Sequence, residues 1–505
     1  MKALYLGFVK SPASSPAGYL SDSGGLYTMR KKRKAIYAIL AATLLGSMIA
    51  GCAGGKSEGT QGTEGTADNG GGEKTEARTL KIMAGVIGGK TPEENGLFEK
   101  EIERLTGITV KLEKPASDYD KKLLAAVSSG EKFDLLQISK EKMNTFIEQG
   151  ILTPLTDKVK GSETLSDPNV IPSEEWAQVE TKDGKIYGVF TKYQGGTMPI
   201  VRNDWLKKLG LPEPKTLDDY YTVLKAFVEQ DPDGNGKKDT YGLSTAGMYE
   251  LQGFFSAAGL KQRYVEKDGK LDVPYSTDAA IPIYEWLAKL YKEGILDPNF
   301  ATNDTGKMRD LFLTDRVGMI TYWDAWVGML NNTRKEQDPN TEFEAKGLPG
   351  AVGPDGNHML RRGDPDVWVI PVNAENPETA FEFIEWWHSK DGIILGSLGI
   401  KDHDYTEQDG KYEMTQTGKE HAMDHGVPFW YNKNVEPPFG KLPGVQEAQD
   451  LLAKYASLEL TPPRWADAEK IINEYSFKAI MGQMPAADAV KKMREELKAN
   501  GLIDG

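Results

Sequence analysis

Apolar and polar positions along the first part of the folded chain predict strands and helices in turn. The runs TLKIMAGV, ITVKLEK and FDLLQIS have the short apolar pattern of β-strands. Each is followed by an amphipathic segment with helical spacing, and the first two such segments end at Gly107 and Gly130. This alternation indicates an α/β protein with a parallel sheet. The expected strands cover 79–86, 108–114 and 133–139, and the expected helices cover 94–107, 119–130 and 142–150.

The segment from Arg30 to Cys52 does not follow that alternation. It contains a cluster of five cations, an apolar run from Ala35 to Ala50, and small residues before the only cysteine of the chain. This layout is typical of a secretory signal and resembles a bacterial lipoprotein signal, which implies that Cys52 receives lipid. The alternative is a single transmembrane helix, for which the apolar run is short, because a span needs about 20 residues.

The residues around this signal have no folding pattern of their own. Because a signal normally starts with its cations, we expect Met29 to be the true start and residues 1–28 to be an upstream extension. Residues 29–51 are then the signal peptide. Residues 52–78 are rich in Gly, Thr, Ser and Glu and lack aromatic residues, which predicts a flexible tether.

The charge of the processed chain excludes some partners. Removing residues 1–51 takes away seven cations and one acid, which leaves 54 Lys and Arg against 74 Asp and Glu, a net charge of −20. Such a charge argues against nucleic acid and against an anionic membrane surface, so we expect membrane contact through the lipid alone. The folded part, about 430 residues, is long enough for two or three domains. With its one cysteine lipidated, the chain has no disulfide framework.

Several segments, taken in order, resemble one protein family. The chain resembles bacterial extracellular solute-binding proteins, the family that includes maltose-binding proteins, and in particular its lipoprotein branch related to alginate- and oligosaccharide-binding proteins. The resemblance extends from residue 79 to 505. It is carried by LTGITV, FDLLQI, FIEQGILTPLTD, DGKIYGVF, VRNDWLKKLGLPEPKTLDDYYTVLKAF, FLTDRVGMITYWDAW and VWVIPVNAENPETAFEFIEWW.

The resemblance implies a fold of two α/β lobes with a ligand cleft between them. The N-terminal lobe is then expected to hold 79–192 and 321–368, and the C-terminal lobe 193–320 and 369–505. The chain is expected to cross between the lobes near Thr191–Pro199, Met319–Tyr322 and Trp368–Pro371.

One loop has the spacing of a calcium site. Oxygen side chains stand at loop positions 1, 3, 5 and 9, position 6 is a glycine, and position 7 offers a backbone carbonyl. Position 12 departs from the pattern, because it is Gly242 instead of a glutamate. The alternative is a polar turn after a helix. We predict a structural Ca²⁺ bound by Asp231, Asp233, Asn235, Lys237 and Asp239.

An aromatic cluster beside an acid is the first candidate for a ligand site. Tyr322, Trp323 and Trp326 flank Asp324. Sugar rings stack on aromatic side chains, and their hydroxyls bond to carboxylates, so we expect these four residues to bind ligand. The alternative is that the two tryptophans pack together in a core.

Further candidates are single residues. Trp430 lies in an expected loop, Tyr193 lies near the first expected crossing, and Ser139 and Lys140 end the third expected strand, where α/β sheets tend to bind ligands. Arg361 belongs to an arginine pair that suits a carboxylate, although such pairs usually lie on a solvated face.

Signals for catalysis are weak. The chain contains no Gly-x-Ser-x-Gly, P-loop or His-Glu-x-x-His sequence, and Asp324 is the single local candidate for a catalytic acid. We therefore expect a non-enzyme. It is predicted to be a monomeric receptor on the extracellular face of the cell membrane that captures an oligosaccharide for the permease subunits of an ABC importer. The alternatives are a receptor for a peptide or a sugar derivative, and a surface carbohydrate-active enzyme.

Overall fold

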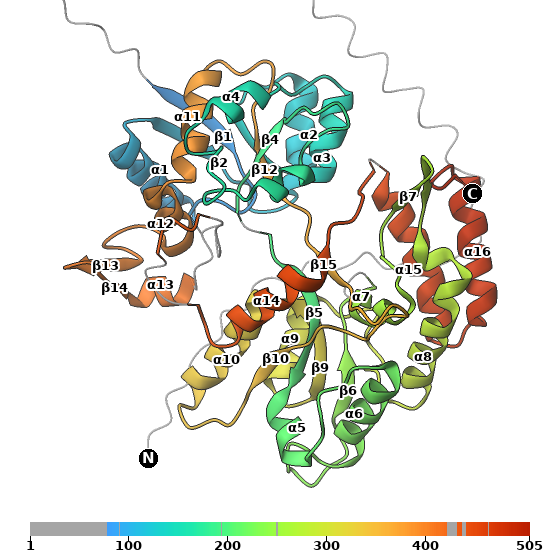
Figure 1. Ribbon diagram of the computed structural model, residues 1–505. Coiled ribbons are helices and arrows are strands. Elements are labelled where there is room, and N and C mark those ends of the chain that lie inside the picture. Colours follow the sequence, from blue (N-terminus) through green and yellow to red (C-terminus); the bar gives the residue numbers. More distant parts are fainter. Residues whose placement is uncertain are drawn as a thin grey trace, which may run out of the picture. The chain divides into compact units, whose positions relative to one another are not determined.

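The computed structural model describes residues 78–89, 91–192, 194–248, 251–421, 432–436, 441–462 and 464–504 (Figure 1). Residues 1–77 lie outside the described part of the chain. They include the expected upstream extension, the expected signal and all but the last residue of the expected tether. Cys52, Tyr193 and Trp430 also lie outside it. The folded part, Thr75–Gly505, forms a compact unit by itself. Within the described residues, the helices are too short or too polar to cross a membrane.

The first sheet has five strands in the order β2-β1-β3-β12-β4. Strands β1, β2 and β3 are parallel, as the alternation of strands and helices predicts, and β12 is antiparallel to both of its neighbours. The helix after β1 starts at a capping box, in which Thr91 and Glu94 bond reciprocally, and it ends at Gly107. The strands are β1 (Thr79–Met83), β2 (Thr109–Glu113), β3 (Leu135–Ser139), β4 (Gly188–Phe190) and β12 (Asp366–Val369).

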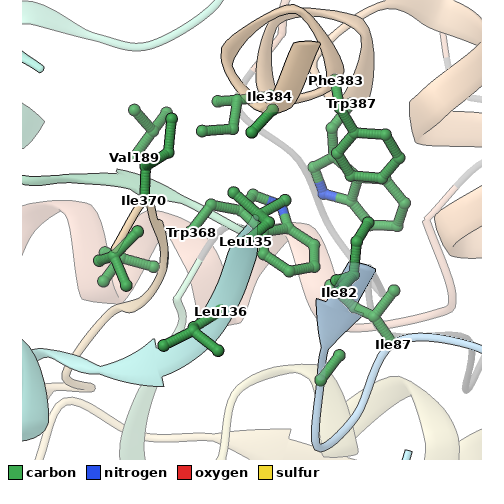
Figure 2. Packing of buried hydrophobic residues seen from close by; sticks show 14 of the residues in the cluster. Ile82, Ile87, Leu135, Leu136, Val189, Trp368, Ile370, Phe383, Ile384 and Trp387 are labelled. Carbon is green, nitrogen blue, oxygen red and sulfur yellow. The ribbon is translucent and has the colours of Figure 1, made fainter. Parts of the chain in front are cut away.

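Helices cover this sheet and complete the first core. Trp368 of β12 packs edge-on against Trp387, with ring centroids 5.9 Å apart, and Figure 2 shows both rings with Ile82 and Leu135 among them. Residues far apart in sequence therefore share one core. The helices are α1 (Pro92–Thr106), α2 (Tyr119–Ser129), α3 (Lys140–Glu148), α4 (Thr156–Gly161), α11 (Pro377–Trp387) and α12 (Lys390–Leu398), with the 3₁₀ helix η1 (Ser173–Gln178).

The second sheet has the order β15-β11-β5-β9-β6, and β10 also pairs with β5. Its central strand β5 is buried at all seven positions, as expected for a strand covered on both faces. The strands are β5 (Gly196–Arg202), β6 (Tyr241–Ser244), β9 (Val317–Trp323), β10 (Ala345–Gly347), β11 (Leu360–Arg362) and β15 (Ala456–Ser457).

The helices around this sheet form two further clusters of buried residues. They are α5 (Asn203–Leu209), α6 (Leu217–Glu229), α7 (Gln252–Phe255), α8 (Ile281–Lys292), α9 (Thr305–Leu313), α10 (Ala325–Gln337), α14 (Val445–Tyr455), α15 (Trp465–Ile480) and α16 (Ala486–Ala499). Two small hairpins stand apart from both sheets: β7 (Val265–Lys267) with β8 (Lys270–Asp272), and β13 (Tyr405–Gln408) with β14 (Lys411–Met414), the latter followed by α13 (Gln416–His421).

The expected division into lobes, 79–192 with 321–368 and 193–320 with 369–505, does not match these sheets. Strands β9, β10 and β11 pair within the second sheet, although residues 321–362 were expected in the first lobe. Conversely, α11 and α12 pack in the first core, although residues from 369 onward were expected in the second.

The expected crossings between the lobes agree with the structure only in part. The one near Thr191–Pro199 contains the link from β4 to β5. Met319–Tyr322 instead lies inside β9, and Trp368–Pro371 lies in or directly after β12. An apolar run predicts a strand but does not indicate which sheet the strand joins, and both sheets here contain buried, apolar strands.

Candidate functional site

Two short segments link the two sheets and run beside each other. Residues 191–195 lead from β4 to β5, and residues 363–365 lead from β11 to β12. The amide of Gly363 donates a hydrogen bond of 2.8 Å to the carbonyl of Gly195. We call 191–195 and 363–365 the connecting segments. Side chains from both sheets reach them, so this region is the candidate site.

Trp323 and Asp324, at the end of β9, lie against the connecting segments. Trp323 is half-buried, and a Cβ atom added at Gly363 would lie 2.5 Å from its ring. A Cβ atom at Gly195 would lie 2.0 Å from the Asp324 carboxylate. Both glycines are therefore needed because only a bare backbone can approach so closely. The Oδ1 atom of Asp324 accepts a hydrogen bond of 3.1 Å from the amide of Gly196.

The Asp324 carboxyl group is 1% exposed. Burial raises its pKa to about 6, although hydrogen bonds from the backbone of Gly196 and Ala325 and from the Gln449 side chain favour the charged form. Among the residues that the structure describes, its Oδ2 atom accepts no well-formed hydrogen bond. Buried acceptors usually have a donor, and a hydroxyl group of a ligand is one that would suit this atom.

Tyr322 and Trp326 lie elsewhere, which corrects the prediction that all four residues of this cluster bind ligand together. Successive residues of a strand point to opposite faces, and Tyr322 is buried in the cluster of β9, α9 and α10. Its ring lies 5.4 Å from that of Trp326, and the guanidinium of Arg309 lies 4.1 Å from the Trp326 ring and bonds the Tyr322 hydroxyl. These two aromatic residues therefore pack under an arginine from α9.

Arg361 is buried, so it does not lie on a solvated face. It is 3% exposed and bonds Asp364 of the connecting segment over 3.1 Å. Its Nε atom lies 3.5 Å from a carboxylate oxygen of Glu459, whose pKa is raised by burial. The neighbouring Arg362 donates to the carbonyl of Gln194 over 3.0 Å and to Glu175 over 2.9 Å. The arginine pair thus holds both connecting segments.

Arg263, which follows α7 in the chain, joins the same group of charges. It forms an ion pair with Asp364 and donates to the Thr461 hydroxyl over 2.9 Å. Thr461 in turn donates to the other oxygen of Asp364 over 3.1 Å. Sequence reasoning missed Arg263, Asp364 and Glu459. Apart from the Arg361–Asp364 pair, their contacts join residues about a hundred apart, and no local spacing signals such contacts.

Ser139 and Lys140 reach the same region from the first sheet, as their place at the end of β3 predicts. The Ser139 hydroxyl accepts a bond of 3.4 Å from the amide of Lys142 and so caps α3. The amide of Lys140 donates to the carbonyl of Pro365 over 3.0 Å. Burial lowers the pKa of Lys140, while the Asp364 carboxylate opposes that shift. The structure therefore brings Ser139, Lys140, Trp323, Asp324 and Arg361 to the connecting segments.

The predicted calcium loop is a tight turn closed by its own side chains. Asp231 accepts from the amides of Asn235 and Gly236 over 3.1 and 3.0 Å. The Asn235 amide group donates to Asp233 and Asp239 over 2.6 and 3.2 Å, which links three of the proposed ligands.

The loop fits a cation in part. Burial and the Asp231 and Asp239 carboxylates raise the pKa of Asp233, and its buried Oδ1 atom has no partner in the described chain. On the other side, Arg316 bonds Asp239 over 3.1 Å. A Cβ atom at Gly242, loop position 12, would lie 2.6 Å from the carbonyl of Leu224, so that position has no room for a ligating side chain. Among the described residues, no three acidic, histidine or cysteine side chains are arranged to hold a metal.

Comparison with known proteins decides what kind of protein this is. Residues 98–395, more than half of the chain, match the family described as bacterial extracellular solute-binding protein. The chain belongs to this family. The lipoprotein LipO of Bacillus subtilis (strain 168) is 30% identical over 417 residues, which cover 79% of this chain and 78% of LipO.

Two other relatives of this solute-binding protein have ligands in their names. The polygalacturonan/rhamnogalacturonan-binding protein YtcQ of B. subtilis (strain 168) is 27% identical over 393 residues, covering 74% of this chain and 75% of YtcQ. The fructooligosaccharide ABC transporter substrate-binding protein FusA of Streptococcus pneumoniae is 26% identical over 369 residues, covering 68% of this chain and 66% of FusA.

Solved structures show the same fold. The alginate-binding protein AlgQ2, determined without calcium ion, superposes with a TM-score of 0.64 at 22% identity, covering 85% of this chain and 96% of AlgQ2. An EF-hand mutant of FusA with fructo-nystose superposes with a TM-score of 0.59 at 21% identity, covering 84% of this chain and 97% of FusA. The predicted two-lobed α/β fold of periplasmic binding proteins is confirmed. The family is described by binding and not by catalysis, which agrees with the expectation of a non-enzyme.

Proposed function

We propose that this solute-binding protein is the receptor of an ABC importer and that it captures an oligosaccharide. Family membership supports the binding role. The names of YtcQ and FusA, a polysaccharide-binding protein and an oligosaccharide transporter component, support a saccharide ligand. The receptor acts as a monomer and delivers its ligand to the permease subunits of the importer.

The observation that carries this proposal is the pair Trp323 and Asp324 beside the connecting segments. A half-buried indole offers a flat apolar face to the C–H face of a sugar ring. The buried, unpartnered Oδ2 atom of Asp324 offers an acceptor to a sugar hydroxyl. Ser139, Lys140 and Arg361 approach the same segments from the two sheets. Closure of the two lobes about these segments would enclose the ligand.

We further propose that the receptor is anchored to the extracellular face of the cell membrane by lipid on Cys52. The layout of cations, apolar run and cysteine supports this, and the name of the relative LipO agrees with it. Residues 1–28, 29–51 and 52–78 then serve as upstream extension, signal peptide and tether. Labelling cells with a radioactive fatty acid should mark the wild-type chain and leave the Cys52→Ala variant unmarked.

We also propose that the loop from Asp231 to Asp239 binds a structural Ca²⁺. The shared hydrogen bonds of Asn235 and the unpartnered oxygen of Asp233 support it. Calcium at 100 times its dissociation constant should stabilise the fold by about 2.7 kcal/mol. Calcium should raise the unfolding temperature and EDTA should reverse the rise, whereas an Asp233→Asn variant should respond to neither. Equal unfolding temperatures of the wild type in calcium and in EDTA would reject this site.

Isothermal titration of the unit Thr75–Gly505 with oligosaccharides tests the receptor role. Trp323→Ala should weaken oligosaccharide binding by about tenfold or more. Trp326→Ala is the matched control, because that indole packs against Arg309 away from the connecting segments. It should lower the unfolding temperature without changing affinity. Binding of peptides in place of sugars would support a peptide receptor, and release of shortened sugars would indicate an enzyme.

A further inference from the structure

Strands β3 and β4 end, and β12 begins, at the same edge of the first sheet. Strand β3 ends at Ser139, which stands opposite Asp366, the first residue of β12. Strand β4 ends at Phe190, which stands opposite Val367. The residues that follow β3 and β4 are therefore close to each other and to the start of β12. Two lysines occur there, Lys140 directly after β3 and Lys192 two residues after β4.

Both lysines are partly buried and form no direct ion pair in the described part of the chain. In the described part of the chain, the ammonium groups of Lys140 and Lys192 take part in no ion pair and no hydrogen bond. Three other lysines of the same lobe form ion pairs: Lys142 pairs with Asp120 over 2.8 Å, and Lys81 and Lys132 pair with glutamates. A partly buried cation without a partner is unfavourable unless a ligand supplies the opposite charge.

Two carboxylates lie near these lysines, and neither forms an ion pair with them in the described residues. Asp364 is bound by Arg263 and Arg361. Burial raises the pKa of Asp366, an effect that the nearby ammonium of Lys192 only partly offsets.

Other charged groups also face this edge. Burial raises the pKa of Glu141, an effect that the ammonium of Lys142 opposes and the Glu469 carboxylate adds to. The guanidinium of Arg263 lies near enough to Lys140 to disfavour its charged form. Within the described residues, the ammonium groups of Lys140 and Lys192 thus stand at this edge without an ion pair, and we call it the cationic edge.

We propose that this cationic edge binds the carboxylate groups of an acidic glycan, so that the ligand is an oligosaccharide containing uronic acid. The inference rests on the proposed receptor function and names the substrate class of the same site. In this arrangement Trp323 stacks on a sugar ring from the side of the second sheet, and Lys140 and Lys192 bind carboxylates from the side of the first. Charge-assisted hydrogen bonds to carboxylates are stronger than neutral ones, so the two lysines set the preference for charged over neutral sugars.

Calorimetric titration with a matched pair of ligands tests this inference without any change to the protein. The unit Thr75–Gly505 is titrated with trigalacturonate and with its fully methyl-esterified form, which has the same rings but no charge; a neutral fructan trisaccharide is the third ligand. We expect the free acid to bind at least tenfold more tightly than the ester. Raising the salt concentration should weaken binding of the acid and leave binding of the ester unchanged.

Lysine variants locate the effect. Lys140→Met and Lys192→Met should each weaken binding of the acid by about tenfold and reduce the preference for the acid over the ester. Lys111→Met is the control, because it removes the same charge from an exposed position of β2, the outermost strand on the side of the sheet away from β4. This variant should bind all ligands like the wild type.

The outcomes separate the two proposals. If the ester or the neutral trisaccharide binds as tightly as the acid, or if both lysine variants bind the acid like the wild type, the acidic-glycan inference is wrong and the receptor function stands. If none of the sugars binds, the proposed oligosaccharide receptor fails and the inference fails with it.

Discussion

The calcium loop and the group of charges around residues 363–365 are both built from acids and their partners, but they differ in sequence range. In the loop, Asp231 bonds amides only four and five residues ahead. In the other region, Asp364 is held by Arg263, 101 residues before it, and by Thr461, 97 residues after it. Spacing along the chain predicted the first arrangement and gave no sign of the second. The difference teaches that local chemistry can be found by pattern, whereas the links between the sheets depend on the whole topology.

Removing Asp364 should have the largest effect on stability. Asp364→Ala leaves Arg263 and the buried Arg361 without their shared carboxylate, and losing one partner of a buried ion pair costs about 3–5 kcal/mol. We expect a loss of about 3 kcal/mol in the free energy of unfolding, measured with urea. A loss below about 1 kcal/mol would show that this group of charges contributes no more than a surface pair.

Gly195→Ala should be the next most damaging change. The new methyl group would displace the Asp324 carboxylate from the amide of Gly196, and overpacking typically costs about 1–3 kcal/mol. Oligosaccharide affinity should fall as well. Gly161→Ala is the control, because a Cβ atom there meets no neighbour within 4 Å. Equal stability of the two variants would contradict the close contact.

The pH dependence of stability should report on Asp324. Its pKa rises from an ordinary value of 3.8 to about 6 in the folded protein, so the folded state binds the proton more tightly than the unfolded state does. The contribution of this group to stability is therefore present at low pH and is lost as pH rises from about 4 to about 6. Relative to the wild type, Asp324→Asn should gain about 2 kcal/mol between pH 4 and pH 7.5. A difference that stays constant with pH would argue against the shift.

The smallest effect is expected in the calcium loop. Arg316→Met removes the exposed partner of Asp239, and exposed ion pairs contribute less than about 1 kcal/mol. Urea unfolding in EDTA should therefore change little. The variant should bind Ca²⁺ more tightly than the wild type, because Asp239 is then free to act as a ligand; weaker calcium binding would mean that Arg316 supports the loop.

Much of the fold could be predicted from the sequence, because helix ends and short strands depend on neighbouring residues. The helix ends at Gly107 and Gly130 are confirmed, and both glycines adopt the left-handed conformation that ends a helix. The Asp183-Gly184 turn between two strand-like runs is typical of a hairpin. Among the described residues it forms only the bridge between Glu180 and Ile186, because β4 pairs with β12 instead. That pairing involves a strand almost two hundred residues away, which periodicity does not reveal.

The candidate site was predictable to a smaller extent. The end of β3 led to Ser139 and Lys140, because the end of such a strand is where α/β proteins often bind ligands, and the structure brings both residues to the connecting segments. The aromatic cluster led to Trp323 and Asp324 but also to Tyr322, since the alternation of a strand shows that neighbours face apart and not which face meets the other sheet. The pairing of Arg361 with Glu459 could not be predicted, because the two residues are far apart in the sequence.

The order of strands in the first sheet has a consequence for biogenesis. Among the described strands, β4 pairs with β12 alone, and β12 lies between β3 and β4. A chain that emerges from a ribosome or an export channel therefore lacks the strand that joins β3 to β4 until residue 369 has appeared. The first lobe can therefore complete its sheet only after most of the second lobe has also been synthesised. Such dependence on distant segments slows folding.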